Sequence, residues 1–100
     1  MLDLNNIRLD SCEKNALINA LYDIEEEVYV TGSRTVRGKN GGDVDLLIFS
    51  KQNALNLSKK ISRRFFMVCE EKIDVLVFDK DNLSIEQKSF INTLKLVRIK

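Results

Sequence analysis

The sequence contains no histidine, no proline and no tryptophan, and it has two cysteines among its 100 residues. The missing histidine excludes serine–histidine and cysteine–histidine catalytic pairs and removes the commonest zinc ligand. Cys12 and Cys69 form no Cys-x-x-Cys motif and no disulfide framework, which predicts two reduced thiols in a cytoplasmic protein. Any chemistry must therefore use carboxylates, hydroxyls, lysines or arginines.

Neither sign of charge is in excess, because 16 lysines and arginines face 15 acidic residues, for a net charge of +1. This balance argues against a polybasic protein that binds nucleic acid. No apolar run approaches the length of a membrane-spanning helix, and the N-terminal stretch has no signal-peptide pattern, so we expect no membrane partner. The charge is uneven along the chain. Residues 1–50 carry a net negative charge, and residues 51–100 carry a net positive charge.

The hydrophobic pattern predicts one small domain over residues 1–100. Helices are predicted over about 11–24, along the apolar stripe from Ala54 to Val68, and from about 84. Strands are predicted over 27–31, 44–49 and 73–78, with a short edge strand at 96–99. This order of elements predicts an α+β fold, a small mixed β-sheet backed by helices.

Three aspartates stand at the beginnings of predicted strands: Asp43 and Asp45 before and within the second strand, and Asp74 in the third. Alternate residues of a strand share a face, so Asp43 and Asp45 point the same way. If the two strands are neighbours, three carboxylates converge and repel one another unless protons, basic groups or metal ions compensate them. An oxygen-only cluster suits Mg²⁺, or Mn²⁺, rather than zinc or iron.

A glycine-rich loop separates the first two strands and begins at Gly32-Ser33. A glycine turn, a hydroxyl and backbone N–H groups are suited to binding phosphates, and Arg34, Arg37 and Lys39 add positive charge to the same segment. Metal ions together with a phosphate-binding loop indicate phosphoryl or nucleotidyl transfer.

At this point the chain resembles the nucleotidyltransferases of the DNA polymerase beta type, in particular the minimal nucleotidyltransferase (MNT) proteins. The resemblance consists of Gly32-Ser33, then Asp43-Val44-Asp45 after a gap, and Asp74 on a later strand. It implies that Asp43, Asp45 and Asp74 bind two Mg²⁺ ions and that Asp74 activates an acceptor hydroxyl.

The resemblance also implies that Gly32, Ser33 and Arg34 bind the nucleotide, most plausibly ATP, whose AMP is transferred. Small prokaryotic MNT proteins commonly act as antitoxins of helical HEPN toxins, so a tyrosine of such a toxin is the candidate acceptor. The alternative is a weakly active or inactive binding module of the same fold that neutralises its partner by contact. The resemblance leaves the oligomeric state open, and a homo-oligomer is one option.

Several of these features also have plain structural interpretations. Each aspartate alone is typical of a turn before a strand, and Asp79 is the reserve for the third carboxylate if Asp74 faces the core. The basic residues at 59, 60, 63 and 64 are typical of the solvated side of an amphipathic helix, and their functional alternative is a docking face for an acidic partner. Tyr29, Phe65 and Phe66 are assigned to packing.

Overall fold

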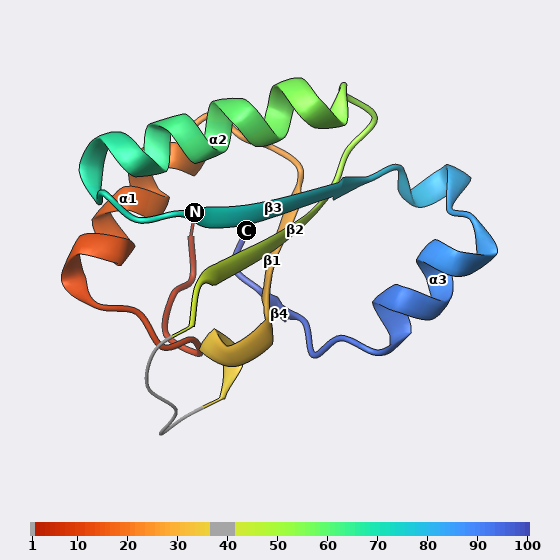
Figure 1. Cartoon of the computed structure of the whole chain (residues 1–100), viewed down its shortest axis with the longest axis horizontal. Helices are drawn as coiled ribbons and strands as arrows, with labels where there is room; N and C mark the ends of the chain where they lie inside the picture. The colour runs from red at the N-terminus through yellow and green to blue at the C-terminus, as the bar shows by residue number, and fades with distance from the viewer. Residues whose placement is uncertain (1, 37–41) are drawn as a thin grey trace.

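The computed structural model describes residues 2–36 and 42–100, and its helices and strands follow the predicted order (Figure 1). The helices are α1 (Ser11–Leu21), α2 (Ala54–Val68) and α3 (Ile85–Asn92), and the strands are β1 (Glu27–Thr31), β2 (Val44–Phe49), β3 (Ile73–Phe78) and β4 (Val97–Arg98). Two short 3₁₀ turns, η1 (Gly32–Thr35) and η2 (Lys80–Asn82), follow β1 and β3. The predicted fold class is confirmed: a four-stranded mixed sheet with helices, consistent with a polymerase beta-like fold.

Local sequence signals explain where the helices begin. Asp10 and Glu13 form a capping box at the start of α1, and Ser84 and Gln87 form one at the start of α3. α1 ends at Leu21, earlier than the predicted end at about 24, although the apolar Ile24 is still buried beyond it.

The strands lie in the order β3-β2-β1-β4. β1 pairs antiparallel with β2 and β4, whereas β2 and β3 are parallel. A parallel pair needs a crossover connection, which α2 provides. The second and third strands are therefore neighbours, which the sequence analysis had left as a condition, and their aspartates Asp45 and Asp74 are in register.

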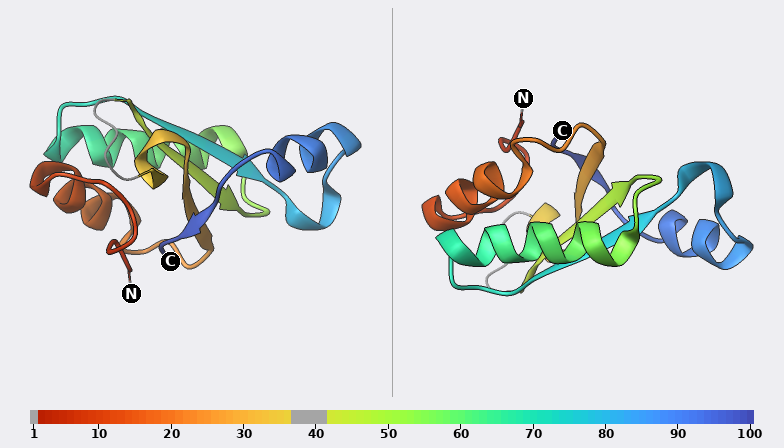
Figure 2. Two further views of the ribbon diagram at one scale, coloured as in Figure 1. Left: turned by 90° about the horizontal axis from the view of Figure 1, so that it is seen from below. Right: turned by 90° about the horizontal axis from the view of Figure 1, so that it is seen from above.

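The two faces of the sheet differ in their covering. α1 and α2 pack on one face, where the core includes Leu17, Phe65 and the helix-facing Val44, Leu46 and Ile48 (Figure 2). The alternate residues of β2, among them Asp45, must point to the opposite face. α3 lies toward one end of the molecule, away from the other two helices (Figure 1).

The assignment of aromatic residues to packing holds in part. Phe65 is fully buried and Tyr29 packs edge-to-face against Phe49, but the Phe66 side chain is 54% exposed. Phe66 directly follows Phe65 on α2, so the turn of the helix carries it away from the core. Among the described residues, no helix is long and apolar enough to cross a membrane.

Candidate functional site

A row of three polar residues crosses the sheet face opposite α1 and α2. Thr31 of β1 is paired with Asp45 of β2, and Asp45 is paired with Asp74 of β3. Residues directly opposite one another in neighbouring strands carry their side chains on the same face. The register thus brings Asp45 and Asp74 together, as expected if the two strands were neighbours, with a threonine beside them that the sequence analysis did not select.

Asp45 is the electrostatic centre of this row. Burial raises the pKa of Asp45, and the nearby Asp74 and Asp43 carboxylates raise it further, while Arg34 opposes them. Among the described residues, the basic group that pairs with Asp74 is the exposed Lys72, whose Nζ lies 3.9 Å from Asp74 Oδ1. Two neighbouring carboxylates that repel each other favour the binding of a cation or a proton.

Asp43 is exposed and lies just before the first residue of β2. In the described part of the chain, Asp43, Asp45 and Asp74 do not bring three carboxylate oxygens within 4.8 Å of one another. The structure therefore pairs Asp45 with Asp74 and leaves Asp43 at the rim of this pair. The reserve residue Asp79 caps η2 and accepts from the backbone N–H of Asp81, as its turn interpretation predicts.

The Thr31 side chain adds an unusual polar group to this row. Thr31 is 4% exposed, and its Oγ1 has no hydrogen-bond partner among the residues that the structure describes. A buried hydroxyl without a partner costs free energy, and such groups often serve a ligand. Strand alternation indicates which face of β1 carries the Thr31 side chain. Only the register shows that Asp45 is its neighbour on β2.

Gly32 and Gly42 bring two backbone segments close to this row. Gly32 has a φ of +78°, and a Cβ on it would lie 2.7 Å from Asp45 Oδ2. Gly42 has a φ of +85°, and a Cβ there would collide with Ser33 Oγ. Both positions require glycine because of their backbone conformation and because of the close approach of a site residue. Ser33, in η1, therefore lies next to the chain that leads into Asp43.

Arg34 has a different place from the predicted one. Its guanidinium donates to both carboxylate oxygens of Glu13, at 2.6 and 2.7 Å, and to the carbonyls of Gly42 and Arg8. These contacts occupy all of its N–H groups, and the residue is 6% exposed. Arg34 thus connects α1 to the loop before Asp43, and its guanidinium is not directed at an open phosphate site. Arg37, Gly38, Lys39 and Gly41 lie outside the described residues.

A second acidic cluster is formed by Asp10, Glu13 and Glu71, whose carboxylate oxygens lie within 4.8 Å of one another. Burial raises the pKa of Glu13, but hydrogen bonds from Arg34 and the Asp10 backbone outweigh burial and lower it overall. Two of its members have structural roles, because Glu13 is paired with Arg34 and Asp10 forms the capping box of α1 with Glu13. We do not assign a metal to it.

A cavity of about 420 Å³ opens beside the Thr31–Asp45–Asp74 row. Leu76, Phe90 and Leu94 supply its apolar side. Phe90 is held against Phe78 in an edge-to-face contact with ring centroids 6.5 Å apart. A polar row next to an apolar wall suits a ligand with a charged end and a flat ring.

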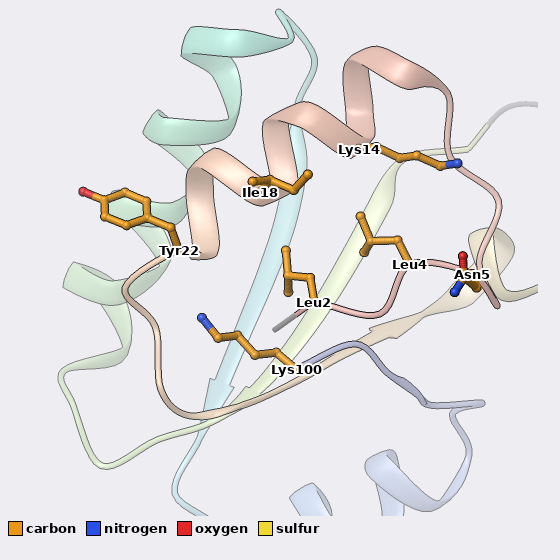
Figure 3. Close-up of a pocket in the computed structure, with 7 residues that line it drawn as sticks. All are labelled: Leu2, Leu4, Asn5, Lys14, Ile18, Tyr22 and Lys100. Carbon is orange, nitrogen blue, oxygen red and sulfur yellow. The ribbon is translucent and has the colours of Figure 1, made fainter.

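A somewhat larger cavity, of about 490 Å³, lies elsewhere, between α1 and the N-terminal segment (Figure 3). Leu2, Leu4 and Ile18 line it together with Lys14 and Lys100. Lys100 Nζ donates to the carbonyl of Leu21 at the end of α1. Its lining within residues 2–36 and 42–100 includes no aspartate or glutamate, so its size does not make it the candidate for cation chemistry.

No protein-family model matches the chain, and no curated protein matches it either. The resemblance to minimal nucleotidyltransferases therefore depends on the motif residues and on their arrangement in the fold.

Proposed function

We propose that the chain is a Mg²⁺-dependent nucleotidyltransferase of the minimal type that transfers AMP from ATP to a hydroxyl acceptor. The observation that carries the proposal is the register of Thr31, Asp45 and Asp74, which places a carboxylate pair and a buried hydroxyl beside Gly32. The donors are all oxygens, which are the ligands that Mg²⁺ and Mn²⁺ prefer. The raised pKa of Asp45, caused by burial and by the neighbouring carboxylates, supports a site that a bound cation would stabilise.

In this proposal Asp45, Asp74 and the rim residue Asp43 would hold the metal ions. Bound Mg²⁺ would neutralise the charge of the phosphates during the transfer. The hydroxyl oxygen of the acceptor forms a bond to the α-phosphorus of ATP, the bond to the bridging oxygen breaks, and pyrophosphate leaves. Asp74 is the group proposed to accept the hydroxyl proton, because its side chain is half exposed at the edge of the sheet.

The phosphates would lie at Gly32 and Ser33, where the chain passes from β1 into η1 and offers backbone N–H groups and the Ser33 hydroxyl. The apolar wall at Leu76, Phe90 and Leu94 would receive the flat part of the nucleotide or of the acceptor. A cytoplasmic location, proposed on the two unpaired thiols, would supply ATP and Mg²⁺. A tyrosine of a HEPN-type toxin remains the proposed acceptor, with the chain acting as its antitoxin.

The test is transfer of label from α-labelled ATP, with Mg²⁺, to a candidate toxin or to proteins of a host lysate. We expect labelled product with the unchanged chain and none with Asp45→Asn or Asp74→Asn. The matched control is Asp81→Asn, the same change at an exposed aspartate that pairs with Lys51 outside the site. Equal labelling by the unchanged chain and Asp45→Asn would contradict the proposal.

Measurements of metal and nucleotide binding distinguish the proposed enzyme from the alternative, a binding module that neutralises its partner by contact. Mn²⁺ binding, measured by its magnetic resonance signal with and without ATP, should weaken strongly in Asp45→Asn and stay unchanged in Asp81→Asn. If the chain holds a toxin tightly but binds neither Mn²⁺ nor ATP, neutralisation by contact replaces the enzyme.

A further inference from the structure

In the part of the chain that the structure describes, the outer edge of β3 has no strand beside it. β3 is the last strand on its side of the sheet, and five of its six residues are apolar. In both views of Figure 2 it borders the sheet next to α2. Unpaired N–H and C=O groups along such an edge readily pair with another extended chain. The opposite edge strand, β4, is only two residues long and offers much less.

A groove of about 450 Å³ lies between this edge and α2. Phe66 and Met67 of α2 and Ile73 of β3 form its apolar part, and Arg63 and Lys72 lie at its rim. The Phe66 side chain is 54% exposed and that of Met67 is 77% exposed. Two large apolar side chains at the border of an open sheet edge are typical of a contact surface.

The charge beside the groove is mainly positive. On α2, Lys60 and Arg64 form ion pairs with Asp23, which lies between α1 and β1. Lys59 and Arg63 form no ion pair with any residue of 2–36 or 42–100. The one acidic residue that lines the groove is Glu71, whose carboxylate accepts from Cys69 Sγ. The groove therefore has an apolar end and the unpaired Arg63 in its lining, and Lys59 lies one turn of α2 before Arg63.

The relative direction of α2 and β3 sets the order of these features. The two elements run antiparallel, as the connection between them requires (Figure 1). Phe66 and Met67 therefore lie near the beginning of β3, and Arg63 and then Lys59 lie beside its later residues. On the helix side of an added strand, alternate residues would meet first the apolar pair and then the two basic residues.

We propose that the β3 edge and this groove bind an extended segment of a partner protein as an added strand. The segment carries one apolar side chain and, at the alternate positions beyond it, acidic side chains. A second copy of this chain is a poorer occupant, because its own β3 would bring another Arg63 and Lys59 toward the first pair. The proposal does not depend on nucleotidyl transfer.

The probe is a short capped peptide, Glu-Thr-Glu-Thr-Leu-Thr-Glu-Thr-Glu, which presents the same pattern in either strand direction. We expect it to bind about tenfold more tightly than the same peptide with lysine in place of glutamate. Binding should fall with added salt. Hydrogen exchange should slow at amides of β3 and not at those of β4.

Charge reversal tests the surface without touching the core. Lys59→Glu with Arg63→Glu should reverse the preference to the lysine peptide, while Lys14→Glu with Lys88→Glu, the same change of net charge on α1 and α3, should leave it unchanged. Absence of exchange protection in β3, or an unchanged preference after the reversal, overturns the proposal. Self-association of the chain alone with protection of β3 would also overturn it, by making a second copy the occupant.

Discussion

This small domain has two separate groups of carboxylates, and within each group the carboxylates lie close together. The two groups differ in the basic residues that balance their negative charge. Asp10, Glu13 and Glu71 bring their carboxylates together, and the guanidinium of Arg34 donates to both oxygens of Glu13. Asp45 and Asp74 are paired across β2 and β3, and among the described residues the exposed Lys72 is the one basic group that forms an ion pair with either of them. The pKa of Glu13 is lowered, whereas the pKa of Asp45 is raised.

This difference shows that closeness of carboxylates alone does not identify a metal site. The Asp10–Glu13–Glu71 group contains a bidentate ion pair between Glu13 and Arg34, so part of its charge is compensated by the same chain. The Asp45–Asp74 pair has no such bidentate ion pair among the described residues, and it has the buried Thr31 hydroxyl beside it. The uncompensated pair is the better candidate for binding a cation from solution.

The largest expected effect comes from breaking the compensated group. Glu13→Ala leaves Arg34 buried without its partner, and removing one member of a buried ion pair costs about 3–5 kcal/mol of the free energy of unfolding. Urea denaturation followed by circular dichroism measures this loss. The control is Asp23→Ala, which removes the exposed partner of Arg64 and should change stability far less. A similar loss in both variants would show that the Arg34 pair is not special.

Gly32→Ala should disturb the uncompensated pair directly. A side chain at φ +78° costs roughly 1–2 kcal/mol, and its Cβ would also displace the Asp45 carboxylate. We expect weaker Mn²⁺ binding together with the loss of stability. Ser33→Ala, the neighbouring change without backbone strain, should keep the stability. Unaltered Mn²⁺ binding in Gly32→Ala would separate Gly32 from the metal site.

Thr31 and Thr35 form a matched test of the buried hydroxyl. Thr35 Oγ1 donates to the Gly32 carbonyl at 2.7 Å, whereas Thr31 Oγ1 has no partner among the described residues. Thr31→Val should raise the free energy of unfolding by about 1 kcal/mol and Thr35→Val should lower it by about the same amount. Thermal unfolding measures both. If Thr31→Val is also destabilising and leaves nucleotide binding unchanged, the hydroxyl has no role in the site.

The smallest effect is the pH dependence, and it has opposite signs in the two groups. The raised pKa of Asp45 means that its contribution to stability declines as the pH rises from its ordinary value of 3.8 through the folded pKa. The lowered pKa of Glu13 gives stability that is present above 4.5 and is lost as the pH falls through the folded pKa. Between pH 3 and 7, the free energy of unfolding should therefore rise more steeply with pH in Asp45→Asn than in the unchanged chain. It should rise less steeply in Glu13→Gln. The same slope in both variants would contradict the comparison.

The elements themselves were predictable because their signals are local. A β-branched and aromatic segment located β1, apolar runs located β2 and β3, and an apolar stripe at helical spacing located α2. The motif residues Gly32, Asp45 and Asp74 were found because strand ends and glycine turns have recognisable residue types. The end of α1 and the exposure of Phe66 were not predicted correctly, because both depend on which neighbours a helix packs against.

The sequence by itself determined the donor chemistry: with no histidine and two unpaired thiols, oxygen atoms of aspartates are what this chain offers a metal ion. Only the tertiary structure decided which carboxylates are free to do so. Arg34 follows Ser33 in the chain and suggested a phosphate contact, but folding brings Glu13 to it from α1 and uses its charge there. The reason is physical: a charge is available for a ligand only if no other group of the folded chain neutralises it, and that pairing depends on contacts between residues far apart in the sequence.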